Sequence, residues 1–396
     1  MTVAYASPGP EVEPSATVWP AIVCMSLLTF VLIASEFMPV SLLTPIAQDL
    51  GTTEGQAGQA IAISGLFAII TSLFGNSLVS RLDRRTVVLL YTSILIVSGV
   101  VVALAPNYAV FMIGRALVGV TIGGFWSLST SILARLSTAD DLPKAMAMLQ
   151  GGTALAAVVA APLGSFLGGL IGWRGAFMIV VPLGIAAFVW QLLVIPRLPP
   201  QRLVSAGAML GLLGKPIVTM GMAATTLAFM GQFALSTYLR PYLENVTALD
   251  VNALSLVLLG VGIGGLAGTS IIGFVLRTHL RAVVIGFPLI MAGLAVLLIL
   301  FGHIGIAVAA LLMIWGLFST PIPVAWGTWM TRVIPDELEA GGGLQVALIQ
   351  FAITFGAFIG GLLYDAAGWQ FTFLFAVALL AASAALALVT TKRSAA

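Results

Sequence analysis

Residues 19–43 read WPAIVCMSLLTFVLIASEFMPVSLL, and Glu36 is the single charged residue in this stretch. About 20 mostly apolar residues in a helix are enough to cross the hydrocarbon core of a membrane. The rest of the chain has the same character, because 60% of its 396 residues are hydrophobic and only 8% are charged. A soluble domain carries roughly 25% charged residues. Lipid must therefore surround most of this chain, which excludes a soluble enzyme.

The apolar runs between charge and turn clusters predict an all-α membrane protein with twelve transmembrane helices. The predicted spans cover residues 19–43, 56–79, 87–105, 108–134, 144–170, 176–195, 216–239, 252–276, 282–301, 304–331, 341–364 and 370–390. We expect a disordered cytoplasmic tail, a six-helix bundle, a cytoplasmic linker, a second six-helix bundle and a short cytoplasmic tail. These parts cover residues 1–18, 19–195, 196–215, 216–390 and 391–396.

The basic residues of the connections predict the orientation of the chain. Positive charge concentrates in cytoplasmic loops of membrane proteins. The even-numbered connections hold nearly all of it, at Arg81, Arg84, Arg85, Arg135, Lys144, Arg197, Arg202, Lys215, Arg277, Arg281 and Arg332. The odd-numbered connections carry acids instead, such as Asp49, Glu244 and Asp365. Both termini are therefore predicted to be cytoplasmic.

Four short elements repeat in the same order about 200 residues further along the chain. Residues 36–39 correspond to 238–241, and 172–174 correspond to 368–370. The other two pairs match Trp126 with Trp326 and Gln150 with Gln350. Repeated bundles of this kind allow the two halves of a transporter to rock around a site at the membrane midplane.

On these features the chain resembles the major facilitator superfamily over nearly its full length. The loop 81–85, which reads RLDRR, resembles the family's basic signature between spans two and three, although Val79 and Thr86 stand where glycines are usual. The stretch 115–119 resembles the proton-coupling signature of span four, and 161–164 with Gly168 and Gly169 resembles the antiporter signature of span five. The resemblance points to the drug:proton antiporter branch. It implies a role in conformational gating for Asp83, Arg84, Arg85 and Pro162.

Longer stretches are similar to bacterial efflux pumps for purine ribonucleosides. They cover residues 36–45, 123–126, 161–168, 231–234 and 238–241. This resemblance implies a monomer in the bacterial inner membrane that exports inosine, guanosine or purine-base analogues in exchange for protons. Efflux of a sugar such as arabinose, or of amphipathic drugs, remains an alternative, because sugar pumps share the Glu-Phe-x-Pro-Val element.

Other classes of function fit the composition less well. A net charge of +2 gives no reason to expect a nucleic-acid partner. A membrane-embedded enzyme would need a catalytic cluster, but there are two histidines and one intramembrane glutamate. The single cysteine and the separated His279 and His303 predict neither a metal site nor a cofactor. A passive channel or a membrane sensor without active transport stays open as a different class.

Glu36 and Arg115 lie inside predicted spans, and Arg240 lies at the outer end of another. Ionisable groups inside spans are costly and usually functional. Glu36 and Arg115 each lie about seven residues from the outer end of a span, or roughly 10 Å below the surface at 1.5 Å per residue. We predict that Glu36 carries the coupling proton and that Arg115 shifts the pKa of Glu36. A permanent structural ion pair is the alternative. Arg240 either reaches the cavity or pairs with Glu244 one turn further on.

A nucleoside needs aromatic faces for its base and hydrogen-bonding groups for its ribose. Base–aromatic stacking contributes about 1–3 kcal/mol in nucleic-acid-binding proteins. The candidate substrate-binding residues lie on the spans that are expected to face the cavity: Phe37, Phe125, Trp126, Gln150, Gln232, Phe233, Tyr238, Arg240, Trp326, Trp329 and Gln350. The alternative for each aromatic residue is an interfacial belt, and for each glutamine a bond to a neighbouring helix.

Overall fold

The computed structural model describes residues 16–75, 79, 81–138, 140–200 and 206–393, and these residues form helices and no strand. The helices of the N-terminal half are α1 (Trp19–Leu50), α2 (Glu54–Ile70), the short π-helix η1 (Thr71–Gly75), α4 (Arg84–Ala103), α5 (Tyr108–Leu136), α6 (Leu142–Met178) and α7 (Val180–Val194). Those that follow are α8 (Ala206–Gly211), η2 (Leu212–Gly214), α9 (Pro216–Thr237), α10 (Leu239–Asn245), α11 (Val251–Phe301), α12 (Gly305–Ser319), α13 (Ile322–Val333), η3 (Pro335–Glu337), α14 (Leu338–Ala367) and α15 (Trp369–Arg393).

Polar residues at the turns start several of these helices. The Thr53 hydroxyl accepts a hydrogen bond from the Gln56 amide, and the Gln56 side chain accepts one from the Thr53 amide. The side chains of Asn107 and Asp250 cap α5 and α11 in the same manner, each on an amide three residues ahead. Such caps satisfy backbone donors that have no partner inside the helix. The helices α2, α5 and α11 thus begin where the sequence supplies a cap.

Ten stretches of the described residues are helical, long and apolar enough to cross a membrane. Two of them, Lys144–Val194 and Val251–Phe301, have 51 residues each. At 1.5 Å per residue such a helix would measure about 76 Å, whereas the hydrocarbon core is about 30 Å thick. Each is interrupted by a non-helical residue, Gly172 (φ 75°, ψ 164°) and His279 (φ −122°, ψ 26°). Each therefore contains two crossings, which agrees with the twelve predicted spans.

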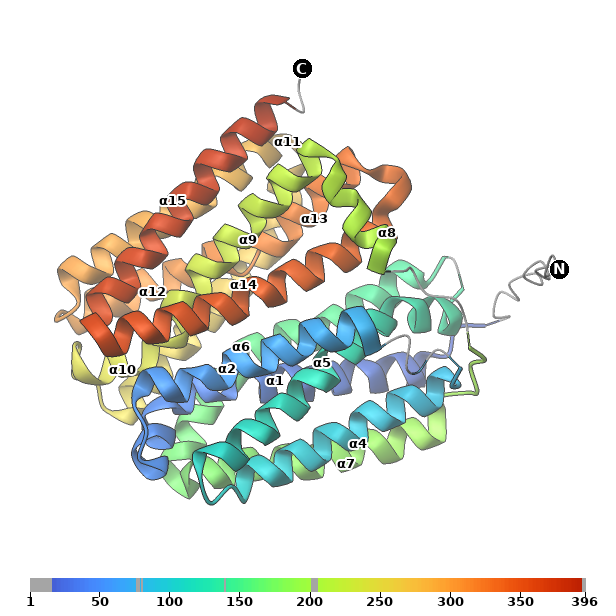
Figure 1. The fold of residues 1–396 in the computed structure, drawn as a ribbon, viewed down its shortest axis with the longest axis horizontal. Helices are drawn as coiled ribbons and strands as arrows, with labels where there is room; N and C mark the ends of the chain where they lie inside the picture. Colours follow the sequence, from blue (N-terminus) through green and yellow to red (C-terminus); the bar gives the residue numbers. More distant parts are fainter. Residues whose placement is uncertain (1–15, 76–78, 80, 139, 201–205, 394–396) are drawn as a thin grey trace.

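The helices form two bundles, each with its own hydrophobic core (Figure 1). One core is built mainly from residues of α1 to α7, joined by Tyr238 of the C-terminal half, and the other mainly from residues of η2 to α15. The bundles meet where α2 packs against α14 and α6 packs against α11. The internal repeat relates α2 to the first part of α11, and α6 to α14. The two contacts therefore exchange under a two-fold axis, as expected for two pseudo-symmetric halves.

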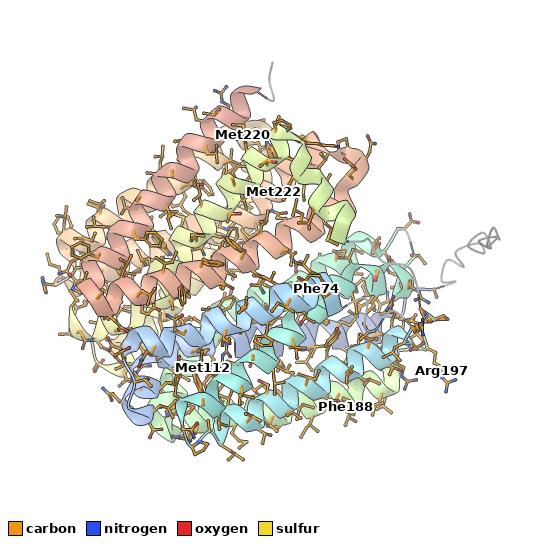
Figure 2. The ribbon with its side chains drawn as sticks, in the orientation of Figure 1. Phe74, Met112, Phe188, Arg197, Met220 and Met222 are labelled. Atoms are coloured by element: carbon orange, nitrogen blue, oxygen red, sulfur yellow. The ribbon has the colours of Figure 1, made fainter. Side chains whose placement is uncertain are left out.

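The bundles diverge toward one end of the molecule and meet at the other (Figure 1). We call the end that carries α8, the start of α1 and the end of α15 the open end. The opposite end, which carries α10 and the α1–α2 connection, is the closed end. Apolar side chains cover the outside of the bundles, as Phe188 does on α7, and Arg197 extends beyond that helix at the open end (Figure 2).

Both predicted tails include a few of the described residues. Residues 1–15 and 394–396 lie outside the described residues. Thr17, which we expected in a disordered tail, donates a hydrogen bond of 2.7 Å to Asp141, and the Val18 amide donates one to the Leu136 carbonyl. At the other terminus α15 continues to Arg393, two residues past the expected start of the tail. Local hydrogen-bond partners at the open end and a continuing helix account for both corrections.

Candidate functional site

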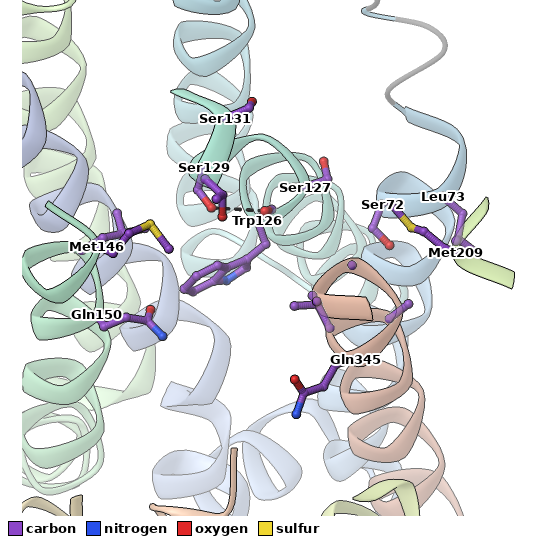
Figure 3. A pocket seen from close by; sticks show the side chains of 16 residues that line it. Ser72, Leu73, Trp126, Ser127, Ser129, Ser131, Met146, Gln150, Met209 and Gln345 are labelled. Atoms are coloured by element: carbon purple, nitrogen blue, oxygen red, sulfur yellow. Dashed lines mark hydrogen bonds between the residues drawn. The ribbon is translucent and has the colours of Figure 1, made fainter. Parts of the chain in front are cut away.

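A cavity of about 420 Å³ lies between the two bundles. It is lined by α5, α6 and η1 of the N-terminal half, by the first turns of α14, and by Met209 of α8. Trp126 lies between Gln150 on one side and Gln345 on the other (Figure 3). The lining residues are Ser72, Leu73, Trp126, Ser127, Ser129, Thr130, Ser131, Met146, Leu149, Gln150, Met209, Gly342, Gly343, Gln345, Val346 and Ala347. None of these described residues is charged.

The cavity wall combines one indole face with many neutral polar groups. Ser129 and Ser131 donate hydrogen bonds to the carbonyls of Trp126 and Leu128 in their own helix, at 3.1 and 2.9 Å. A hydroxyl that donates in this way still has lone pairs that can accept a hydrogen bond. The amides of Gln150 and Gln345 add donors as well as acceptors. The wall thus suits a small uncharged ligand that has a flat face and several N–H and O–H groups.

Glu36 lies deeper than its predicted position. Because α1 continues to Leu50 instead of ending near residue 43, Glu36 is fourteen residues from the end of its helix, or about 21 Å along the axis. Its side chain is only 2% exposed. Gln350 of α14, in the other half, lies within hydrogen-bond distance, with Nε2 3.3 Å from Glu36 Oε1. An ionisable group near the middle of α1 thus contacts both halves of the molecule.

Arg115 contacts Glu36 through the backbone and not through the carboxylate. Its two terminal nitrogens donate hydrogen bonds of 2.7 Å to the carbonyls of Ser35 and Glu36. Nε donates to the Ala60 carbonyl of α2 at 3.2 Å. Among the described residues, no ion pair within 4.0 Å joins the Glu36 carboxylate to the Arg115 guanidinium. The arginine is fully buried and fixes α1, α2 and α5 against one another.

Two of the predicted aromatic residues meet between the halves. The rings of Phe37 on α1 and Phe233 on α9 are stacked, with centroids 5.4 Å apart and an angle of 27°. Phe229 extends the stack on the C-terminal side at 6.5 Å. Gln232, beside Phe233, has a buried side-chain oxygen without a hydrogen-bond partner. This layer lies between the bundles and apart from the residues that line the cavity.

Four other predicted aromatic residues lie inside the protein. Phe125 and Trp326 are 1% and 2% exposed, and Trp329 is 4% exposed. Trp326 and Trp329 pack edge to face within the C-terminal core, with centroids 5.4 Å apart. Tyr238 donates a hydrogen bond of 2.8 Å to the Ala357 carbonyl and stacks on Tyr364. Of the predicted substrate-binding residues, only Trp126 and Gln150 line the cavity. The pseudo-symmetric tryptophan, Trp326, is packed in the C-terminal core instead.

Charged groups join the halves at the closed end. Arg240 of α10 pairs with Glu244, with Nε 2.8 Å from Oε1. This pair is one of the two alternatives predicted for Arg240. The same guanidinium also reaches the other half, where it donates to the Ser41 carbonyl of α1. Asp365 at the end of α14 accepts hydrogen bonds from the Thr53 hydroxyl, at 2.6 Å, and from the Gly55 amide, at 3.0 Å. The contacts of Arg240 with Ser41 and of Asp365 with Thr53 and Gly55 cross from one bundle to the other.

Sequence reasoning did not assign Asp365 or Ser41 to the site. Asp365 is predicted from the sequence only as one of the acids of the odd-numbered connections. Its place at the end of a span, opposite the capped start of α2, could have indicated its role. Ser41 contributes a backbone carbonyl, which no residue type could reveal. Met209 belongs to the segment predicted as a cytoplasmic linker, and it lines the cavity.

The predicted gating residues bond within the N-terminal half and to the start of the linker. Asp83 caps α4 by accepting from the Arg85 amide at 2.9 Å. The Arg84 amide donates to the Leu198 carbonyl at 2.8 Å, and Arg85 donates to the Leu192 carbonyl. Pro162 lies inside α6, near Gly164, whose missing side chain lets α6 approach Ser41 of α1.

Within the described residues no cluster of three or more histidine, cysteine or acidic side chains could hold a metal ion. We define the candidate site as the cavity at the open end, the Glu36–Gln350 contact and the charged contacts of the closed end.

Comparisons with known proteins agree with this fold. A model of the Major Facilitator Superfamily matches residues 25–338 and 221–396. A protein named "Transcription regulatory protein OpdE" from Pseudomonas aeruginosa is 48% identical over 381 residues, which are 95% of each chain. The "Purine ribonucleoside efflux pump NepI" of Salmonella typhimurium is 41% identical over 347 residues, which are 88% of this chain and 87% of that one.

A solved structure of a bacterial homologue of the human lysosomal transporter Spinster, inward-facing and unoccupied, has the same fold. Its TM-score is 0.75, and the match covers 97% of this chain and 98% of that one. At 15% identity the likeness concerns the fold alone.

Proposed function

Because the chain belongs to the major facilitator superfamily, we propose that this transporter exports purine ribonucleosides and purine-base analogues, such as inosine and guanosine, in exchange for protons. The observation that carries the substrate class is the cavity wall. It offers the Trp126 face, the amides of Gln150 and Gln345, several hydroxyls and no charge. A neutral base with a ribose matches these groups. The 41% identity to a purine ribonucleoside efflux pump supports the same substrate.

The open end faces the cytoplasm in this proposal. Basic residues such as Arg81, Arg135 and Arg197 lie at the connections of that end, and positive charge favours the cytoplasmic side of the bacterial inner membrane. The cavity then loads substrate from inside the cell, between bundles of residues 19–195 and 216–390. The loop with Asp83, Arg84 and Arg85, together with the proline of α6, acts as a gate when this end shuts.

Export requires the closed end to open while the open end shuts. Opening separates Arg240 from Ser41 and Asp365 from Thr53. It also separates Phe37 from Phe233, which leaves two aromatic faces for the base on its way out. Substitution of these contacts is expected to change the balance between the two conformations, because a ligand or mutation shifts that balance by its differential interaction with them.

Glu36 is the proton carrier in this proposal. An ionised carboxylate is costly in a buried site without a paired cation, whereas a protonated one is tolerated there. The contact with Gln350 exists while the closed end is shut. When this end opens, water and the higher proton concentration outside reach Glu36. Arg115 holds the α1 backbone on both sides of the acid and so keeps its position constant.

Transport by purified protein in liposomes tests this function. With an acidic lumen, one pH unit of gradient and the membrane potential clamped at zero, one-to-one exchange predicts about tenfold accumulation of inosine. Arabinose and a cationic dye serve as competitors, and we expect neither to compete. Accumulation of arabinose or the dye but not inosine would replace the substrate class and leave the antiport mechanism in place.

The relative from Pseudomonas aeruginosa favours a second candidate, a membrane sensor without transport. That protein carries the name of a transcription regulator and is 48% identical to this chain. The same liposomes separate the two functions. A sensor would bind inosine, with a change in the fluorescence of Trp126 beside the cavity, but would not accumulate it under any gradient.

A further inference from the structure

Gln150 and Gln350 occupy equivalent positions in the two halves, but their surroundings differ. Gln150 of α6 is exposed and lines the cavity at the open end (Figure 3). Gln350 of α14 is 7% exposed and lies outside the cavity wall, with its Nε2 3.3 Å from Glu36 Oε1. Symmetry would give both residues the same task. Their contacts instead separate a substrate-facing glutamine from one that contacts the buried acid.

We propose that Gln350 is the positioning residue that holds the Glu36 carboxyl between the two halves in both of its protonation states, and so couples proton exchange to their separation. This rests on the proposed function, because it assigns Glu36 the transported proton. Among the described residues, Gln350 provides the side-chain hydrogen bond to that carboxyl, and it comes from the opposite half.

The chemistry of the amide carries the proposal. An ionised carboxylate only accepts hydrogen bonds, whereas a protonated one also donates. A carboxamide offers both an N–H donor and a carbonyl acceptor. The carbonyl oxygen of Gln350 is buried and has no hydrogen-bond partner. When Glu36 gains a proton, rotation of the amide about its last side-chain bond turns this oxygen toward the acid, where it accepts the new O–H.

The charged groups around Glu36 do not hydrogen-bond its carboxyl, whereas Gln350 does. Arg115 of α5 is the cation that faces it, and its hydrogen bonds go to the carbonyls of Ser35, Glu36 and Ala60 and to the Ser64 hydroxyl. The other ionisable residues that join or flank the interface, Glu54, Arg240, Glu244 and Asp365, lie toward the closed end of α2, α10 and α14. An apolar residue at 350 would leave the buried carboxyl without its partner in either state.

The location gives the contact its coupling role. Glu36 belongs to the N-terminal half and Gln350 to the C-terminal half, so rocking of the halves makes and breaks this bond. A contact that exists in one conformation only can bias the equilibrium between two conformations. The N–H bond to the ionised carboxylate is charge-assisted and therefore stronger than the neutral bond to the protonated carboxyl. Gain of a proton by Glu36 thus weakens the contact that must break when the halves separate.

A double-substitution experiment in liposomes tests the proposal. Gln350→Leu should shift the pH midpoint of inosine exchange by about one unit and reduce pH-driven accumulation at least fivefold. Gln150→Leu is the matched control, and it should raise the KM of exchange without moving the pH midpoint. In a Glu36→Gln background, Gln350→Leu should add no further change to the pH profile, because the titrating partner is absent.

Two outcomes would overturn the proposal. If Gln350→Leu raises KM and leaves the pH profile of the wild type unchanged, Gln350 contacts substrate. If its effect is as large in the Glu36→Gln background as in the wild type, Gln350 acts through packing. The thermal unfolding temperature of the Gln350→Leu protein, compared with that of the wild type, checks that a loss in the leucine variant is not a loss of fold. If the wild type shows no inosine exchange at all, the proposed function fails instead.

Discussion

The two ends of the molecule are held by different chemistry. The closed end is joined across the halves by charged and polar groups, with Arg240 on the Ser41 carbonyl and Asp365 on Thr53 and Gly55. The open end has a neutral cavity with an indole and serine hydroxyls. The hydrogen bonds between the halves that involve α14 begin at Gln350 and continue toward Asp365. The first turns of α14 line the cavity instead.

This difference indicates which contacts stabilise the conformation described above. Direct hydrogen bonds between the halves favour the closed end being shut, and each is worth roughly 0.5–3 kcal/mol, depending on charge and exposure. A few such bonds are enough to hold one conformation and few enough to be broken during transport. In the proposed function, the neutral open end selects the substrate.

Close packing at the closed end gives the largest predicted effect. A methyl group added at Gly361 would overlap the Tyr238 hydroxyl and lie 2.9 Å from both Gln59 Nε2 and the Gly55 carbonyl. Overpacking of this kind costs about 1–3 kcal/mol, so Gly361→Ala should favour opening by about tenfold or more. A Cys24→Ser, Ser41→Cys reporter should then react faster with a membrane-impermeant maleimide added outside.

Gly342→Ala on the same helix is the matched control, because nothing lies within 4 Å of the added methyl group there. It should leave the reaction rate of the reporter unchanged. Equal rates in the two alanine variants would show that the α2–α14 contact does not hold the closed end shut.

Substitution of Trp126 tests whether the cavity at the open end binds substrate. Trp126→Ala removes the flat face of the cavity and should raise the KM for inosine about tenfold, since stacking on a base contributes about 1–3 kcal/mol. Trp326→Ala is the contrast, because Trp326 is buried in the C-terminal core. It should lower thermal stability and the yield of folded protein more than it changes KM. A tenfold KM effect from Trp326 and none from Trp126 would reverse the assignment.

Asp365 gives a smaller effect at the closed end. Asp365→Asn keeps an acceptor for the Thr53 hydroxyl but loses the charge, and the residue is exposed. Exposed charges contribute only about 0.2–1 kcal/mol. We expect the labelling rate of the Ser41→Cys reporter to increase by about twofold to fivefold. A decrease would mean that the carboxylate favours the open conformation of this end.

The smallest effect concerns a surface acid at the open end. The Thr17 hydroxyl, followed by Lys144, lowers the pKa of Asp141 from its usual value. An acid whose pKa is lower in the folded protein stabilises it above the unfolded pKa, which is near 3.9, and this stabilisation is lost as the pH falls through the folded value. Asp141→Asn should therefore unfold at a slightly lower temperature at pH 7. The gap should close as the pH falls toward 3, and a gap that widens would contradict this sign.

Much of the fold could be predicted from the sequence, because apolar length and loop charge are local properties. The apolar spans and the repeat that relates Gln150 to Gln350 are readable from residue types. The break between the last two spans of the N-terminal half could also be read, at Gly172, where a positive φ favours glycine.

The candidate site could be predicted only in part, because it depends on how two separate bundles meet. Trp126 and Trp326 match in the repeat, but one lines the cavity and the other is buried, since the halves do not pack their equivalent helices alike. Arg115 was expected to face the Glu36 carboxylate and instead bonds the backbone around it. The carboxylate meets Gln350, a partner 314 positions away that no local pattern indicates.

The central claim is that Glu36 carries the transported proton, and its most direct test compares the wild type with Glu36→Gln in liposomes. Under one pH unit of gradient with an acidic lumen, the wild type should accumulate inosine about tenfold. The glutamine variant should reach the same inosine concentration on both sides and still exchange labelled for unlabelled inosine at equal pH. Accumulation by the variant to the wild-type level would contradict the account.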